Sequence, residues 1–249
     1  SKDWNLSEID ESLLNGFKDY LLHKSLSRKG KRLSRNSASS YFDKIKLAMN
    51  EALRLRLIST NPSIKVSGIK VEESKKEYLT KDEIQLLFST PCDDSIIKNS
   101  FLFSVLTGLR FSDVKALKWS DVRYSDEIGN HLVFRQSKTK RHEVLPIHEQ
   151  AINLIGERGN DESEVFEGLS YTVHNNRKLH KWIKAAGIKK HITFHCARHT
   201  HASLLLANGT DIYTVSKMLG HKQIQTTTIY LKVMDESKRK AIDSIPFFI

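Results

Sequence analysis

The sequence predicts a mainly α-helical protein with a small antiparallel β-sheet, arranged as two domains. Apolar residues recur at helical spacing along most of the chain, and only residues 131–136 and 142–147 alternate in the way that strands do. Residues 65–78 are polar and show no period, which is typical of a linker. We therefore expect a small helical domain over residues 1–64 and an α+β domain over residues 79–249.

Two helices are expected in the first domain. Ser7–Asp10 resembles a capping box, and the apolar pattern that follows it predicts a helix from Ser7 to Leu22. A second apolar pattern covers Tyr41–Leu53, and Asn36 and Ser37 precede it as N-cap candidates.

The second domain should begin and end with helices. A capping box at Thr80–Glu83 opens helices over residues 84–88 and 96–106. The two alternating segments then form a hairpin around the polar loop 137–141, and helices resume from His148.

Basic residues dominate the charge of the chain. The formal net charge is +11 and the isoelectric point is about 9.5, which favours a polyanionic partner. Residues 21–40 contain no acid and six basic residues: Lys24, Arg28, Lys29, Lys31, Arg32 and Arg35. A charge run is usually a solvated face, so charge alone favours a nucleic acid only slightly.

Cysteine usage and hydropathy exclude several classes of protein. Cys92 and Cys196 lie far apart, so neither a disulfide framework nor a paired-cysteine metal site is expected. No apolar run is long enough to span a membrane, and the first residues do not resemble a signal peptide. We expect a cytoplasmic protein without a membrane partner.

Residues 193–207 predict a helix that carries several chemically active side chains. His195 and Arg198 are three residues apart and share one face, so both can address a single oxyanion. His199 follows His195 by four residues, as in many zinc sites, but no third ligand or neighbouring glutamate supports a zinc centre. The plainer alternative is that His199 and His201 are packed or solvated.

Three more candidates stand near turns. Arg110 lies at a junction between two expected helices, with Asp113 as an alternative ion-pair partner. His221 follows Gly220, which allows the chain to reverse, and Tyr230 comes nine residues later. Singly, His221 could be a capping residue and Tyr230 an ordinary half-buried aromatic.

Together these residues resemble the tyrosine recombinases, also called the phage integrase or lambda integrase family, including the integrases of phages and conjugative transposons. Thr107–Trp119 looks like the first box of the family. His195–Tyr230 is similar to the second box, with its His-x-x-Arg-His-Thr, Leu-Gly-His and tyrosine elements. The likeness extends over about residues 36–235. By resemblance, the catalytic set is Arg110, Lys138, His195, Arg198, His221 and Tyr230.

The resemblance implies a site-specific DNA recombinase that cleaves and rejoins strands through a 3′-phosphotyrosyl intermediate. Tyr230 is the expected nucleophile, His195 the general base and Lys138 the general acid. The two arginines and His221 would stabilise charge on the pentavalent phosphate. A phosphotyrosine keeps the energy of the broken bond, and no carboxylate cluster is evident in the sequence, so neither a cofactor nor a metal is expected.

The resemblance also implies double-stranded DNA as the partner. Residues 1–64 are similar to part of a helical core-binding domain, so we expect the chain to begin partway through that domain. The expected DNA contacts are Lys31, Arg32, Arg35, Ser37, Ser40, Tyr41, Lys44, Lys140 and Arg141.

The C-terminal residues are apolar after a charged, helical-looking segment, Asp235–Lys240. Free termini are usually polar, so the apolar residues from Ile242 to Ile249 should be buried. They could pack on their own domain. The family resemblance instead implies that they dock into a neighbouring protomer, which predicts a homotetramer on DNA and leaves room for accessory DNA-bending proteins.

Two other functions stay open. An enzyme similar to type IB topoisomerases would relax DNA by the same phosphotyrosine chemistry without exchanging partners, and a silent relative would only bind DNA. The complete residue set argues against the silent relative. The Leu219–His221 element and the tail argue against the topoisomerase.

Overall fold

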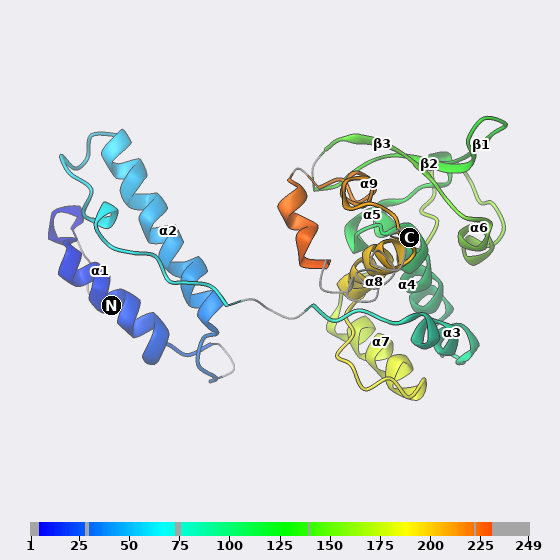
Figure 1. Ribbon diagram of the computed structural model, residues 1–249, viewed down its shortest axis with the longest axis horizontal. Helices are drawn as coiled ribbons and strands as arrows, with labels where there is room; N and C mark the ends of the chain where they lie inside the picture. Colours follow the sequence, from blue (N-terminus) through cyan, green and yellow to red (C-terminus); the bar gives the residue numbers. More distant parts are fainter. Residues whose placement is uncertain (1–4, 28–29, 73–75, 139, 222, 231–249) are drawn as a thin grey trace, which may run out of the picture. The chain divides into compact units, whose positions relative to one another are not determined.

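The computed structural model describes residues 5–27, 30–72, 76–138, 140–221 and 223–230. The chain divides into two compact units, Ser1–Lys75 and Lys76–Ile249 (Figure 1). Each unit has its own hydrophobic core.

The first unit contains two long helices. Its elements are η1 (Leu6–Glu8), α1 (Glu11–His23), α2 (Arg35–Arg54) and η2 (Pro62–Ile64). The predicted helix from Ser7 begins too early, because Ile9 is extended and Asp10 accepts the bond from the Leu13 amide, 2.7 Å away. The predicted N-cap of the second helix is also wrong. Ser34 caps α2 by accepting from the Ser37 amide, so the helix starts at Arg35.

The segment after η2 packs along the two helices. Its Val66 and Ile69 join the core with Leu14, Leu21 and Phe42. The carbonyls of Val66 and Ile69 accept hydrogen bonds from α2, 2.8 and 3.0 Å long. Residues 66–72, which lie within the expected linker, are therefore held against the first unit through backbone polar groups and apolar side chains.

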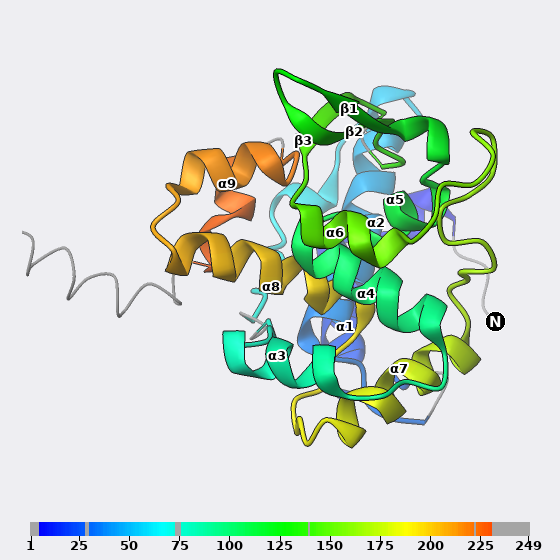
Figure 2. The same ribbon diagram turned by 90° about the vertical axis from the view of Figure 1, so that its right-hand side faces the viewer.

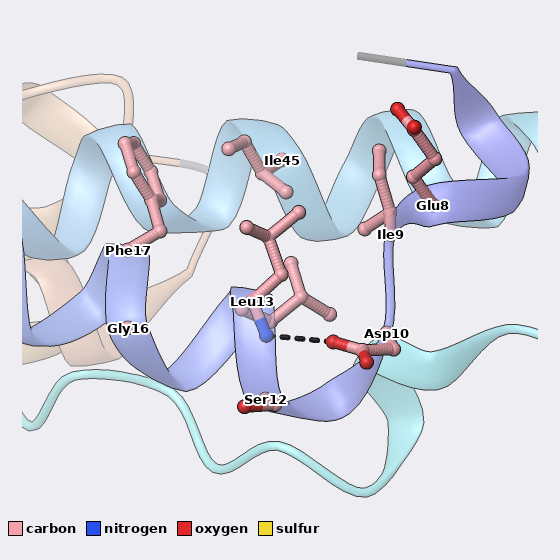
Figure 3. A pocket seen from close by; sticks show the side chains of 9 residues that line it. Glu8, Ile9, Asp10, Ser12, Leu13, Gly16, Phe17 and Ile45 are labelled. Carbon is pink, nitrogen blue, oxygen red and sulfur yellow. Dashed lines mark hydrogen bonds between the residues drawn. The ribbon is translucent and has the colours of Figure 1, made fainter.

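An open pocket lies between α1 and α2 (Figure 3). Its lining residues come from Glu8 to Phe17 and from Ile45. Figure 3 shows Leu13, Phe17 and Ile45 along its apolar wall, next to the Asp10 cap of α1.

The second unit is built around α4 (Ser95–Thr107), which contacts α8 (Phe194–Ala207) and α6 (Glu149–Ile155) (Figures 1 and 2). Phe101, Leu102 and Phe103 are completely buried, since they lie on several sides of a helix that is covered all round. Its other helices are α3 (Lys81–Ser89), α5 (Phe111–Ala116), α7 (Val173–Ala185), α9 (Ile212–Met218), η3 (Trp119–Asp121) and η4 (Ile224–Thr226). In the part of the chain that is described, none of the helices could cross a membrane by length and hydropathy.

A three-stranded antiparallel sheet lies at one end of the second unit (Figure 2). Its order is β1 (Val122–Ser125), β2 (Gly129–Arg135) and β3 (His142–Pro146). Leu132 of β2 pairs with Val122 on one side and Leu145 on the other, which places three apolar side chains on the buried face. The hairpin and the fold class are as predicted. Strand β1 was not predicted, because a segment of four residues is too short for its alternation to be a clear signal.

The turn after α4 allows two helices to approach closely. Gly108 has a φ of 71°, and a Cβ atom there would lie 2.6 Å from Cδ2 of His201 on α8. Glycine is therefore required both by the backbone conformation and by the contact with α8.

Replacing Gly108 by alanine should destabilise the second unit through both effects. We expect Gly108→Ala to lower the free energy of unfolding by roughly 2–4 kcal/mol, from a left-handed alanine and a steric clash. Gly129 is a matched control, because its φ is 75° and nothing lies within 4 Å of an added Cβ. Gly129→Ala should cost only about 1–2 kcal/mol. Equal losses in urea unfolding would show that the His201 contact contributes nothing.

Candidate functional site

A buried arginine joins three segments of the second unit. Arg198 of α8 is only 4% exposed. Its guanidinium donates to the carbonyl of Gly108, 2.8 Å away, and to the carbonyl of Leu219. These carbonyls end α4 and α9, where a helix leaves acceptors without intrahelical partners. Arg198 thus brings the turns before Arg110 and His221 to α8.

Arg110 lies at the start of α5, in the N-cap position. Its Nη1 atom is 3.3 Å from Oε1 of Gln136 and 3.8 Å from Oδ2 of Asp113. The other oxygen of Asp113 accepts the Ser137 amide, 2.8 Å away. Asp113 and Gln136 therefore connect Arg110 to the base of the hairpin loop.

The sequence predicts Asp113 only as an alternative partner of Arg110, and it gives no sign of a role for Gln136. The three-residue spacing indicated the ion pair of Asp113, but no local signal indicated its bond to the hairpin. Gln136 is 3% exposed, and a Cβ at Gly220 would collide with its amide. The base of the hairpin is thus packed against the turn that presents His221.

Lys138 is exposed on the hairpin loop. Its positive charge contributes to lowering the pKa of both His195 and His221, so it lies close enough to act on both rings. Lys140 and Arg141 follow on the same loop and are also exposed.

His221 follows Gly220, whose φ of 61° reverses the chain after α9. Its Nδ1 atom lies 2.8 Å from the hydroxyl of Thr227, a residue with no exposed surface. Burial, together with the charges of Arg198 and Arg110, lowers the pKa of His221 to about 4. The ring is therefore neutral at pH 7 in the absence of an anion.

Tyr230 is 4% exposed and packs on Ala202, Leu206, Val215 and Leu219. Burial raises the pKa of its phenol to about 12, while Arg198 and Arg110 oppose that shift. The hydroxyl lies 2.7 Å from Nδ1 of His199. The tyrosine is thus held on α8, beside both arginines.

His195 and His199, whose spacing is also found in zinc sites, have different surroundings. His195 is exposed, and its ring meets that of His199 edge to face with centroids 4.6 Å apart. His199 is buried, as the alternative to a zinc ligand predicted. Its hydrogen-bond partner is Tyr230. Among the described residues, no three His, Cys, Asp or Glu side chains are grouped as a metal site requires.

Four expected DNA contacts share one face of α2. Ser37 precedes the neighbours Ser40 and Tyr41 by three and four residues, and Lys44 follows them by four and three. Ser40, Tyr41 and Lys44 are exposed. Lys44 Nζ lies 5.4 Å from the centroid of the Tyr41 ring.

The other expected contacts of the first unit precede that face. Lys31 and Arg32 are exposed where the chain pairs Leu26 with Arg32. Arg35 is partly engaged, because its Nε donates to the Lys70 carbonyl over 2.9 Å. The apolar tail, Ile242–Ile249, lies outside the described residues.

Comparisons with known proteins match nearly the whole chain. Residues 77–237 match the model of the phage integrase family, and residues 1–66 match that of the phage integrase SAM-like domain. A tyrosine recombinase of Thermosipho africanus is 27% identical in an alignment of 218 residues, and the match covers 84% of this chain and 74% of that protein.

Two solved structures show the same fold. The crystal structure of XerA recombinase has 26% identity and a TM-score of 0.56, and the match covers 98% of this chain and 86% of that one. A lambda integrase tetramer bound to a Holliday junction has 23% identity and a TM-score of 0.65, with 92% and 66% covered.

The buried His201 should make stability depend on pH. Its Nδ1 donates to the Val105 carbonyl over 2.9 Å, and burial lowers its pKa from 6.5 to about 4. Between these values the unfolded chain binds the extra proton, so stability is complete above pH 6.5 and falls as the pH drops towards 4. The loss should approach roughly 3 kcal/mol.

Urea unfolding followed by tryptophan fluorescence measures this effect, because Trp119 and Trp182 are buried in the second unit. His201→Gln should reduce the decline between pH 6.5 and 4 by roughly 3 kcal/mol. It should leave the contributions of His199 and His221, whose pKa values are also lowered to about 4. The matched control is His174→Gln on the exposed start of α7, which should leave the decline as in the wild type. An unchanged profile in His201→Gln contradicts the assignment.

Proposed function

This chain belongs to the phage integrase family and is a site-specific tyrosine recombinase that cleaves and rejoins DNA, and we propose on that premise that Tyr230 is its nucleophile. The observation that carries the proposal is the position of the phenol on α8. Its hydroxyl bonds to His199 and lies near Arg198 and Arg110, whose charges act on its pKa. A phenol beside two permanent cations suits attack on a phosphodiester.

In the proposed step, the Tyr230 oxygen attacks the scissile phosphorus and the bond to the 5′ oxygen breaks. Arg110, Arg198 and His221 stabilise the negative charge that develops on the non-bridging oxygens. Losing one preorganised donor of this kind typically slows the chemical step by about 10² to 10³. Arg198 already uses two of its N–H groups on backbone carbonyls, so it contributes its charge and its remaining donors.

The departing 5′ oxygen needs a proton, and we assign that role to Lys138. The lysine is exposed on a loop whose base is fixed to Arg110 through Asp113 and Gln136. Its charge acts on the pKa values of His195 and His221, which fits a lysine that approaches the phosphate from the hairpin. The resemblance assigns the phenolic proton to His195, which stays a prediction.

The 3′-phosphotyrosyl bond preserves the energy of the cleaved phosphodiester, so rejoining needs no nucleotide cofactor. The two arginines supply charge where many nucleases use metal ions. We therefore propose that neither a cofactor nor a metal takes part in strand transfer.

Double-stranded DNA is the proposed partner of both units. The face formed by Ser37, Ser40, Tyr41 and Lys44 offers hydroxyls and a cation to phosphates, and Lys140 and Arg141 do the same on the hairpin. Because the proposed substrate is DNA, we propose that the protein acts in the cytoplasm of a bacterium. Residues 1–64 would then serve as part of a core-binding domain.

Assembly on DNA is proposed from the lambda integrase relative, which was solved as a tetramer bound to a Holliday junction. We propose that Ile242–Ile249 docks into a neighbouring protomer and organises a homotetramer. Accessory DNA-bending proteins would act on the same complex. An assay for strand exchange between two duplexes distinguishes a recombinase from an enzyme that only relaxes DNA.

Removing the Tyr230 hydroxyl should abolish covalent chemistry while leaving DNA binding intact. On a nicked recombination site, the wild type should form an adduct that survives denaturation, and Tyr230→Phe should form none. Phenylalanine keeps the packing on Leu206 and Leu219. The matched control is Tyr213→Phe on α9, an exposed tyrosine, which should form the adduct normally. An adduct of normal yield in Tyr230→Phe would show that another residue attacks.

A substrate with sulfur in place of the bridging 5′ oxygen tests Lys138. We expect Lys138→Ala to slow cleavage of ordinary DNA by roughly 10² to 10⁴, the range for a general acid. A thiolate leaves without a proton because its pKa is far lower than that of an alcohol, so the sulfur substrate should restore the rate. Lys140→Ala serves as the control and should cause similar, small losses with both substrates. Equal losses with both substrates in Lys138→Ala would make Lys138 a phosphate anchor.

A further inference from the structure

His199 is a buried titratable group for which the family resemblance provides no role. Its Nδ1 atom lies 2.7 Å from the Tyr230 hydroxyl, and both residues are less than a tenth exposed. Among the described contacts, no hydrogen bond joins His195 to Tyr230. His195 is also exposed.

The surroundings of His199 keep its imidazole neutral before DNA binds. Burial is the largest of the causes that lower its pKa to about 4. Positive or ionisable groups contribute the rest: His195 and Arg198 on its own helix, Lys76 before α3, and His221 after α9. A neutral imidazole has one nitrogen with a free lone pair, and a protonated phenol can donate to it.

We propose that His199 is a catalytic residue that orients the Tyr230 hydroxyl and takes its proton during DNA cleavage. This inference rests on the proposed function, in which Tyr230 is the nucleophile. The proposal places the hydrogen of the imidazole on Nε2, so that Nδ1 accepts from the phenol 2.7 Å away. His195, exposed on the same helix, is then free to bond to the phosphate.

One cleavage exchanges one phosphoester bond for another and moves two protons. The phenolic oxygen forms a bond to phosphorus, its proton moves to Nδ1 of His199, and the phosphorus bond to the 5′ oxygen breaks. Lys138 gives a proton to that oxygen and becomes a neutral amine. In rejoining, the 5′ hydroxyl attacks the phosphotyrosine, Lys138 regains its proton, and the imidazolium of His199 returns its proton to Tyr230.

The timing of the proton transfer follows from the same surroundings. The phenol is a much weaker acid than the imidazolium in the free protein, so the proton remains on Tyr230 before attack. As the bond to phosphorus forms, the phenolic oxygen loses its basicity and the proton moves. The phosphate also brings negative charge to a site with two arginines, which favours protonation of His199.

The decisive experiment compares His199→Asn with His195→Asn in the full chain. The Asn side-chain oxygen can accept a hydrogen bond near the position of Nδ1, but it cannot take a proton. Single-turnover adduct formation on nicked DNA is measured from pH 6 to pH 9. We expect His199→Asn to slow cleavage at pH 7 by about 10² to 10⁴ without weakening DNA binding.

The pH profile separates proton transfer from simple positioning. In His199→Asn the phenol must ionise to solvent, so the rate should rise about tenfold per pH unit below the pKa of the phenol. His195→Asn should keep the shape of the wild-type profile. If His199→Asn keeps the wild-type profile, or if only His195→Asn acquires the steep rise, the proposal is overturned.

A measurement on the wild type avoids any effect of the substitution on folding. Nitrogen-15 NMR of labelled histidine distinguishes a bare ring nitrogen from one that carries hydrogen. The proposal requires a bare Nδ1 in His199, and a hydrogen on Nδ1 overturns it. Failure of the proposed function is distinct, because it would appear as an adduct in Tyr230→Phe. If Tyr230→Phe forms none and His199→Asn behaves as the wild type, only the inference about His199 fails.

Discussion

The arrangement of the second unit depends on the two hydrogen bonds that Arg198 donates to the carbonyls of Gly108 and Leu219. Each carbonyl ends a helix and would otherwise be a buried acceptor without a partner, which costs about 1–3 kcal/mol. One side chain therefore satisfies the ends of α4 and α9 and brings the turns that carry Arg110 and His221 to α8. In the proposed function the same guanidinium also stabilises the phosphate. Replacing Arg198 by alanine would therefore remove its structural and its catalytic role together.

Concentrated positive charge is the cost of this arrangement. Burial and the neighbouring Arg110 lower the pKa of Arg198 to about 10, yet the group stays charged at neutral pH. Asp113 compensates only in part, since one of its oxygens already binds the Ser137 amide. A bound phosphate relieves repulsion that the free protein must tolerate, and binding of the substrate should thus stabilise the fold around the site.

Local chemistry made part of the structure predictable. The Thr80–Glu83 capping box and the hairpin around residues 137–141 depend on neighbours in sequence, and both formed as expected. The starts of α1 and α2 could not be located, because several Ser, Asn and Asp residues compete as caps and the tertiary fold decides. The bonds from Asp113 to Ser137 and from His199 to Tyr230 span 24 and 31 residues. Helical spacing places both histidines on α8 but does not determine which one the tyrosine meets.

The packing of Tyr230 on α8 and α9 has a consequence for stoichiometry. The ring belongs to a cluster made by Ala202, Leu206, Val215 and Leu219 of its own chain. With its tyrosine packed on its own chain, a subunit that uses the proposed set would not need Tyr230 from a neighbour. A subunit that carries this arrangement to DNA would cut the half-site that it occupies. In a mixed assembly of intact and inactive subunits, the number of cuts would follow the number of intact chains in direct proportion.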